Sequence, residues 1–325
     1  MTTSNDPRID IRVAADSELD EAISVCAQAL KWSSPTFDEA LFRWKHVDNH
    51  FGRSLLLVAA EQSKTGSRIV AVRPLMRWRF ITPTGNTIEA ARAVDTATLP
   101  EVQGQGLFRR LTLQGIERLE ADGCGFVFNT PNAKSLAGYL KMGWFDAGEI
   151  SFGMRLRSSR SLPRLAKSRT SADKPSIEVP NLGVEVEPAL DALDPNVLTP
   201  TFPTPDTFRT AHTLDSLKWR FCGGPVTYRY LPIDGNGGVI VRVRSRGKIR
   251  ELVSALTVGS PLDSDVASII GDAMELSNAD VCIAEPTLAK TLRIPKLGPT
   301  LALRSVTVPV SPGQFAWTPG DIELF

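Results

Sequence analysis

A pair of glycines in the segment Gln103-Gly104-Gln105-Gly106 constrains this chain more than any other sequence feature. An apolar, strand-like run precedes the pair, and a helical pattern with apolar residues at 107, 111, 113, 116 and 119 follows it. Two glycines separated by one residue let the backbone turn tightly and direct successive N–H groups toward one point. The positive end of the following helix lies over the same loop. The pattern therefore predicts an anion site that suits a diphosphate.

The residues around the glycines decide which kind of phosphate-binding loop this is. A Walker loop needs Gly-Lys-Ser/Thr and a dinucleotide loop needs three spaced glycines, and the segment has neither pattern. It resembles instead the Q/R-x-x-G-x-G/A signature of the GNAT acyl-CoA transferases, with Gln103 and Gly106 in the two leading positions. Phe108 departs from that signature, because the family usually has Gly or Ala there.

A second segment, residues 130–144, resembles the family's second cofactor segment. Asn132 opens a short helix, and Tyr139 precedes a Lys-x-Gly-aromatic ending at Trp144. A long helix and a short apolar strand at residues 125–129 separate this segment from the glycine loop, in the order typical of the family. On these two motifs the chain is identified as a member of the GNAT superfamily.

The same residues also have purely structural interpretations. Asn132 is a good helix cap, and Ser135 three residues later adds to that cap. Tyr139 can be a core aromatic residue whose hydroxyl bonds to backbone. The glycine pair can form an ordinary turn between a strand and a helix. The resemblance makes these interpretations compatible with the functional ones, because the family uses the same caps and turns to hold its cofactor.

The resemblance implies acetyl-CoA, or another acyl-CoA, as cosubstrate and the amine of a small molecule as acceptor. An amino sugar is the leading candidate for that acceptor, and no metal is required. The residues that would contact the cofactor, with a backbone N–H at Ala97 or Thr98 facing the developing oxyanion, are Ala97, Thr98, Gln103, Gly104, Gln105, Gly106, Leu107, Phe108, Asn132 and Ser135. Tyr139 stands at the position of the family's general acid and would protonate the departing thiolate.

Asp95 is the best carboxylate for the general base, since it lies on the same strand between apolar neighbours. If it is buried, its pKa should rise toward a useful value. It can equally be a structural acceptor paired with Arg92 or Arg73. Some tandem members of the family use the C-terminal carboxylate of the chain instead, and the apolar ending at residues 322–325 is a candidate for that role.

The length of 325 residues predicts two domains. The first, residues 1–157, should contain strands at 9–14, 55–60, 69–80, 88–98 and 145–156, with helices at 16–30 and 37–44. Residues 158–182 are rich in Ser, Pro and basic side chains, which predicts an exposed linker. We expect it to be a solvated tether, or else a strand of cations near the cofactor phosphates.

Residues 183–325 repeat the plan of the first domain. The segment 213–221 echoes 38–46, and strands, a helix at 266–276 and a last strand at 301–310 follow. The counterpart of the glycine loop has one glycine, Pro261, and carboxylates at Asp263 and Asp265, so it should repel a pyrophosphate. The counterpart of the Asn-to-Tyr helix, residues 286–292, has no tyrosine. We expect two tandem α/β units, each a mixed, mostly antiparallel sheet flanked by helices, the second a degenerate copy.

Composition narrows the class of protein further. A net charge of +1 gives no field to recruit nucleic acid or an anionic membrane. No apolar run approaches the roughly 20 residues of a membrane span, and the N-terminus lacks a signal-peptide core. Four scattered cysteines predict a reducing compartment, and three histidines form no metal motif. We therefore expect a cytoplasmic enzyme. Two alternatives stay open: an acyl-CoA-binding protein without turnover, and a peptidoglycan-type tandem GNAT protein that transfers aminoacyl groups.

Overall fold

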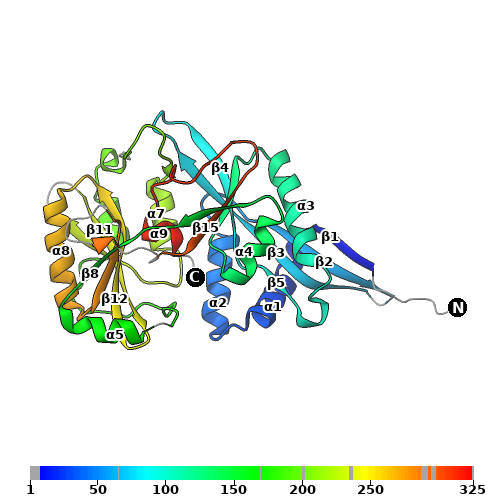
Figure 1. Cartoon of the computed structure of the whole chain (residues 1–325), viewed down its shortest axis with the longest axis horizontal. Coiled ribbons are helices and arrows are strands. Elements are labelled where there is room, and N and C mark those ends of the chain that lie inside the picture. Colours follow the sequence, from blue (N-terminus) through cyan, green and yellow to red (C-terminus); the bar gives the residue numbers. More distant parts are fainter. Residues whose placement is uncertain are drawn as a thin grey trace. The chain divides into compact units, whose positions relative to one another are not determined.

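The computed structural model describes residues 8–64, 66–168, 170–199, 202–233, 237–286, 292–293 and 298–323. The chain divides into two compact units. Unit 1 comprises Met1–Phe80, Thr87–Ala147 and Leu301–Ser311, and unit 2 comprises Ile81–Asn86, Gly148–Thr300 and Pro312–Phe325. Figure 1 shows the chain coloured along its sequence. No helix in the described part of the chain is long and apolar enough to cross a membrane.

Unit 1 is built on a mixed sheet whose strands follow the order β1-β2-β3-β4-β6-β15-β7, with β5 paired to β3. Neighbouring strands are antiparallel from β1 to β3 and at β6 and β15, and parallel at β4 and β6. Its strands are β1 (Arg8–Val13), β2 (Leu55–Ser63), β3 (Gly66–Ile81), β4 (Thr87–Ala93), β5 (Ala97–Thr98), β6 (Phe126–Asn129), β7 (Phe145–Glu149) and β15 (Thr300–Ser305). Its helices are η1 (Asp16–Glu18), α1 (Leu19–Leu30), α2 (Pro35–His46), η2 (Pro100–Val102), α3 (Leu107–Ala121) and α4 (Ala133–Leu140).

Helix α3 packs closely on this sheet because its buried face carries small and branched residues. Leu111 and Leu119 are fully buried. Gly115 lies where a Cβ atom would come 2.6 Å from Leu75 Cδ1 and 3.2 Å from Leu57 Cδ1. A larger residue at 115 would push the helix away from β2 and β3. This packing holds α3 against β2 and β3, and the N-terminal end of α3 directly follows the glycine loop, where the predicted anion site lies.

Unit 2 is built on a second mixed sheet in the order β10-β11-β12-β13-β8-β14. The strands of this sheet are β8 (Gly153–Leu156), β10 (Arg229–Ile233), β11 (Gly237–Arg246), β12 (Ile249–Gly259), β13 (Val281–Ala284) and β14 (Leu292–Arg293). Strand β9 (Arg209–Thr210) is not part of this sheet. Its helices are η3 (Ser159–Ser161), α5 (Leu162–Lys167), α6 (Val186–Asp191), η4 (Pro195–Leu198), α7 (Leu214–Phe221), α8 (Asp263–Leu276) and α9 (Pro319–Ile322). The expected fold class, with mixed and mostly antiparallel sheets flanked by helices, is confirmed.

Two strands pair with the sheet opposite to the one expected. Strand β8, expected to close the first domain, pairs with β13 in unit 2. Strand β15, expected to end the second domain, pairs with β6 in unit 1, where Leu303 and Ala302 are fully buried. Boundaries at residues 157 and 183 therefore do not separate the two compact units. A short apolar strand fits either sheet, and its partner is chosen by packing rather than by local sequence.

Residues 158–182 are part of unit 2 and not a solvated tether. The backbone N–H groups of Asp173 and Ile177 donate to the carbonyls of Ser245 and Val243 on β11, at 2.8 and 2.7 Å. Leu182 at the end of the segment is buried with 2% of its surface exposed. The apolar residues 177, 179 and 182 join the core of unit 2, which outweighs the polar composition of the rest of the segment.

Candidate functional site

The glycine loop between β5 and α3 has the backbone conformation that its sequence predicts. Gly104 and Gly106 have φ angles of +82° and +74°, in the left-handed region that favours glycine. A Cβ atom built on either glycine meets nothing within 4 Å, so the space beside the loop is open. The first turn of α3 contains no acidic residue. Its backbone N–H groups and positive end are therefore available to an anion.

A cavity of about 830 Å³ within unit 1 opens at this loop. The predicted site residues that line it are Asp95, Ala97, Thr98, Gln103, Gly104, Gly106, Leu107, Phe108, Asn132, Ser135 and Tyr139. Gln105, also predicted, is outside this lining. Arg92, Arg109 and Lys134 line the cavity as well and were not predicted. The adjacent pair of arginines after the glycine loop was the signal available for Arg109.

The strand expected at residues 88–98 is interrupted, and the interruption forms one wall of the cavity. β4 pairs with β6 from Ala90 to Arg92, whereas β5 pairs with β3. Between them Asp95 has a φ of 54°, which breaks the extended conformation. The sequence pattern missed this break because neither glycine nor proline stands at it.

The pairing of β5 distinguishes the two predicted backbone donors. The N–H of Leu99 donates to the carbonyl of Val70 on β3 at 2.9 Å. Successive N–H groups of a strand point in opposite directions, so the N–H of Thr98 points away from β3 while that of Ala97 points toward it. The side-chain amide of Gln103 donates to the Thr98 carbonyl at 3.1 Å and ties the loop to this strand. Thr98 is thus the better placed of the two donors.

Tyr139 on α4 is buried, with 4% of its surface exposed, and its ring lies between two other aromatic rings. Its centroid is 5.3 Å from that of Phe108 and 5.1 Å from that of Trp144. Phe108, which departs from the family signature, fits because Gly138 leaves room for it: a Cβ at 138 would lie 3.2 Å from the Phe108 ring. The Tyr139 oxygen accepts a hydrogen bond of 2.8 Å from Nη1 of Arg73.

Asn132 and Ser135 form the cap at the start of α4. The backbone N–H of Ser135 donates to Asn132 Oδ1 at 2.9 Å, and the Ser135 hydroxyl donates to the Asn132 carbonyl at 3.1 Å. Both residues line the cavity. The capping interpretation is therefore confirmed, and it places both side chains beside the space that a cofactor would use.

Asp95 pairs with two residues of α2 rather than with Arg92 or Arg73. Its Oδ2 accepts hydrogen bonds from Nζ of Lys45 and from Nε2 of His46, the latter at 2.9 Å. Burial by itself raises the pKa of Asp95, but the charge of Lys45 and the hydrogen bond from His46 outweigh burial and hold the pKa below its usual range. The upward shift expected from burial alone is therefore wrong, because neighbouring cations were not considered.

His46 links Asp95 to Ser54 through its two ring nitrogens. Burial lowers its pKa, against the opposing effect of Asp95. A neutral imidazole that donates from Nε2 has its acceptor at Nδ1, which lies 2.8 Å from the Ser54 hydroxyl. Ser54 therefore donates to His46, and His46 donates to Asp95. The residues of α2 that hold Asp95 were not predicted, since they are about 50 positions away from it in the sequence.

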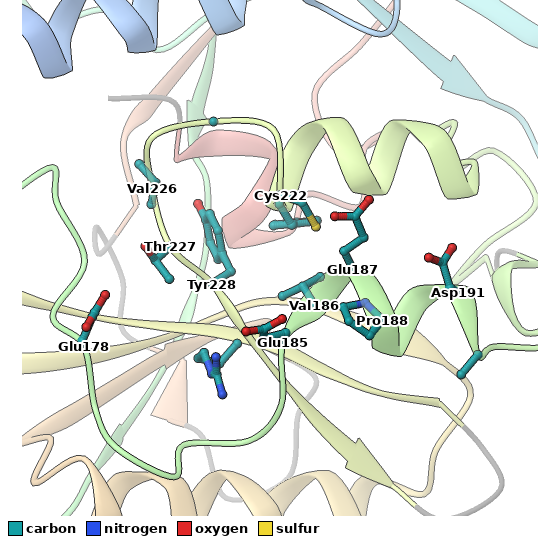
Figure 2. Close-up of a pocket in the computed structure, with 14 residues that line it drawn as sticks. Glu178, Glu185, Val186, Glu187, Pro188, Asp191, Cys222, Val226, Thr227 and Tyr228 are labelled. Carbon is teal, nitrogen blue, oxygen red and sulfur yellow. The ribbon is translucent and has the colours of Figure 1, made fainter.

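Unit 2 holds a larger cavity of about 960 Å³ with a different character. Carboxylates at Glu178, Glu185, Glu187 and Asp191 line it, as Figure 2 shows. Lys218 pairs with Asp191 at 2.6 Å. No residue of the unit 2 counterpart of the glycine loop lines this cavity. Such an acidic lining opposes a diphosphate.

The counterpart of the glycine loop in unit 2 also lacks the features of an anion site. It has a single glycine, Gly259, with a φ of +84°. Asp263 and Asp265 occupy the first turn of α8, where they pair with the positive end of the helix themselves. Most of the counterpart of the Asn-to-Tyr helix, residues 286–292, lies outside the described residues, as do the last two residues of the candidate C-terminal ending.

Comparison with known proteins agrees with this geometry. Residues 10–146 match the Acetyltransferase (GNAT) domain family. The fold resembles that of a conserved Enterococcus faecalis protein described as a probable N-acyltransferase, with 11% identity, a TM-score of 0.64, and coverage of 93% of this chain and 73% of that one. It also resembles a GCN5-related N-acetyltransferase from Kribbella flavida, with 13% identity, a TM-score of 0.56, and coverage of 94% and 73%. A third similar structure is Eis1 from Mycobacterium abscessus, with 15% identity, a TM-score of 0.53, and coverage of 92% and 74%.

The comparison with curated proteins finds no match. At these low identities the solved structures establish the fold alone, and the domain match covers the segment that carries the glycine loop, Asp95 and Tyr139. The cavity, the loop and the short capped helix thus lie in a recognised acetyltransferase domain. Residues 10–146 of this chain are thus similar to the GNAT acetyltransferase domain family.

Proposed function

We propose that this chain is an acetyl-CoA-dependent N-acetyltransferase that acts on the amine of a small molecule, with an amino sugar as the leading candidate. One observation carries the proposal: a single cavity of unit 1 is lined by both the glycine loop at the start of α3 and Tyr139. Acyl transfer from a thioester needs an anion site for the cofactor and a proton donor for its sulfur. Here both requirements meet in one space.

The cofactor binds with its diphosphate at the glycine loop. The N–H groups around Gly104 and Gly106 and the positive end of α3 face the phosphate oxygens. Arg109 and Lys134, which line the same cavity, add positive charge. The acyl group then lies toward the interruption between β4 and β5, where the Thr98 N–H meets the carbonyl oxygen as it becomes negative.

Tyr139 completes the reaction as general acid. The amine nitrogen forms a bond to the carbonyl carbon, the carbon–sulfur bond breaks with its electron pair on sulfur, and the Tyr139 hydroxyl proton passes to the sulfur. The amine nitrogen loses one proton to water. Because its lowered pKa makes Asp95 a weak base, we assign it mainly to binding and orienting the amine before the proton leaves to water.

Tyr139→Phe tests the proposal, since it removes the donor and keeps the ring and its packing. Thiol release with a panel of amino sugars, amino acids, polyamines and antibiotic amines identifies an acceptor first. The variant should then lose on the order of 10²-fold in kcat, with acetyl-CoA affinity by calorimetry within about twofold of the parent. Tyr228→Phe is the matched control, because Tyr228 is a buried tyrosine of unit 2 that also accepts from an arginine. A parent that binds acetyl-CoA but releases no thiol with any amine would identify a binding protein without turnover.

A further inference from the structure

Arg73 on β3 is an unusual neighbour for a general acid. Its side chain is fully buried, and its guanidinium donates through Nη1 to the Tyr139 oxygen at 2.8 Å and to the Thr96 hydroxyl. Its carbon Cζ lies 5.4 Å from the centroid of Phe108 and 5.3 Å from that of Tyr139. Nε and Nη2 of Arg73 are buried and have no hydrogen-bond partner among the described residues.

A buried guanidinium in this state is destabilised. Within the described part of the chain, no carboxylate lies within ion-pair distance of Arg73. A buried cation without a counter-ion loses hydration free energy that only a nearby negative charge restores. The atom best placed to carry such a charge is the Tyr139 oxygen, which becomes negative when its proton is given away.

Unit 2 contains a second buried arginine–tyrosine pair, Arg220 and Tyr228, whose hydrogen bonds can be compared with those of Arg73 and Tyr139. Arg220 donates to the Tyr228 oxygen at 3.1 Å, and its Cζ lies 5.4 Å from that ring. The remaining donors of Arg220 go to backbone carbonyls, at 3.0 and 2.7 Å to Gly320 and at 2.9 Å to Glu323. Arg220 thus holds a segment in place, whereas the remaining donors of Arg73 hold none of the described residues.

Donor and acceptor chemistry decides what Arg73 does to the Tyr139 hydroxyl. A guanidinium only donates, so the Tyr139 oxygen must be the acceptor of their bond, and the hydroxyl proton is left for another partner. Tyr139 lines the cavity that holds the proposed thioester site. A carbonyl or carboxylate in the place of Arg73 would have taken that proton instead.

We propose that Arg73 is a positioning residue for Tyr139: it leaves the Tyr139 proton free to pass to the departing sulfur, and its charge stabilises the phenolate formed by that transfer. The inference rests on the proposed transferase function. In the transfer, the O–H bond of Tyr139 breaks, its electron pair stays on oxygen beside Arg73, and a new S–H bond forms on coenzyme A. Tyr139 later regains a proton from water. A preorganised charge aimed at a developing anion is an effective form of catalysis.

Five proteins test the proposal: the parent, Arg73→Met, Arg73→Lys, Tyr139→Phe, and the double variant of Arg73→Met and Tyr139→Phe. Met has a similar length and no charge. Arg73→Met should lower kcat by about 10- to 100-fold while acetyl-CoA affinity stays within about twofold, and Arg73→Lys should recover part of the loss. If Arg73 acts through Tyr139, then adding Arg73→Met to Tyr139→Phe should lower kcat by less than about twofold relative to Tyr139→Phe alone. Losses that multiply in the double variant would overturn the proposal.

A second readout does not depend on turnover, so it separates this inference from the proposed function. The chain has only three tyrosines, and the tyrosinate absorbance band that disappears in Tyr139→Phe belongs to Tyr139. Removal of the adjacent cation disfavours the phenolate, so this band should appear at higher pH in Arg73→Met than in the parent. Arg73→Lys, which keeps the charge, serves if Arg73→Met does not fold, and its band should stay near that of the parent. A band that does not move in Arg73→Met, or that moves fully in Arg73→Lys, would refute the inference even if the parent proved inactive.

Discussion

Asp95 shows at the scale of single residues how a strained backbone is held. Its φ of 54° is uncommon for a residue other than glycine. The side chain offsets this strain by accepting from Lys45 and His46, which are both buried. Since Lys45 would be a buried charge without a partner if Asp95 were removed, Asp95→Asn should destabilise the protein as well as affect the reaction. Any activity measured for that variant therefore needs a measured fraction folded beside it.

The buried histidines make the free energy of unfolding depend on pH. Burial lowers the pKa of His46 below the ordinary value of 6.5 that it has in the unfolded chain, and it does the same for His212. Below pH 6.5 the unfolded state thus binds protons that the native state does not, and stability falls as pH falls. Each such histidine contributes at most about 1.4 kcal/mol per pH unit. Urea unfolding at pH 7.5 and pH 5.5 measures this loss.

His46→Gln isolates the share of His46, because the glutamine amide can still donate to Asp95 but does not titrate. The variant should lose less stability than the parent between the two pH values. His50→Gln, at an exposed position of the same segment, is the matched control. Asp95 does not affect this comparison. Because the pKa of Asp95 is lowered in the folded protein, its contribution to stability is lost only below pH 3.8, the ordinary pKa of an aspartate. An equal pH dependence in His46→Gln and the parent would contradict the assignment.

Among the structural elements, we expect the turn from β5 into α3 to contribute most to the affinity for the cofactor. Gly106→Glu places a carboxylate at the first position before α3, where the diphosphate is expected, and forces a side chain into a φ of +74°. Calorimetry should show acetyl-CoA affinity reduced by more than about 10²-fold. Gly85→Glu is the control, because Gly85 also has a positive φ of 82° and open space around it. Equal affinity in Gly106→Glu and the parent would remove the anion site from this loop.

Strand β15 makes a second prediction at this scale. A fragment of residues 9–157 contains every unit 1 strand except β15, so β6 loses its antiparallel partner in the middle of the sheet. Exposed backbone groups on both strands that flank the gap favour aggregation. We expect this fragment to aggregate, and we expect residues 9–149 joined by a short Gly/Ser linker to residues 300–311 to unfold cooperatively. Circular dichroism and size-exclusion chromatography compare them. A stable monomeric 9–157 fragment would show that β15 is dispensable.

At the scale of the whole molecule, the two units share a plan but differ in charge. Along the chain of unit 1, α3 lies between β4 and β6, which pair in parallel. Along the chain of unit 2, α8 lies between β12 and β13, which also pair in parallel. Each of these second strands then pairs with an antiparallel strand from a distant part of the chain. This likeness supports our proposal that unit 2 is a degenerate GNAT-like copy. Asp263 and Asp265 at the start of α8 are the reason why we expect it to bind no cofactor.

The full chain should accordingly bind one molecule of acetyl-CoA. Calorimetry of the parent should give a stoichiometry of one per chain, because the first turn of α3 after Gly104 and Gly106 has no acidic residue, whereas the first turn of α8 carries Asp263 and Asp265. Gly106→Glu should then remove all the binding heat rather than half of it. A stoichiometry of two, or binding that survives in Gly106→Glu, would place a second site in unit 2.

Those parts of the protein whose conformation depends on near neighbours in the chain could be predicted from the sequence. The turn at Gly104 and Gly106, the helix from Leu107 and the Asn132 cap are local, because backbone conformation and capping involve residues within a few positions. The order of these motifs predicted the GNAT domain that residues 10–146 match. The strand predicted at residues 88–98 was too long, because no local sequence signal indicates the left-handed conformation of Asp95.

Contacts between residues that are distant in the sequence could not be predicted, because they form only when the chain folds. Arg73 reaches Tyr139 across 66 positions, and Lys45 reaches Asp95 across 50. The sheets that β8 and β15 join also depend on distant residues, since the local sequence of a short apolar strand does not specify its partner strand. Pairing, burial and the sign of a pKa shift depend on the charges and apolar surfaces that the folded chain brings together, and those are set by packing over the whole molecule.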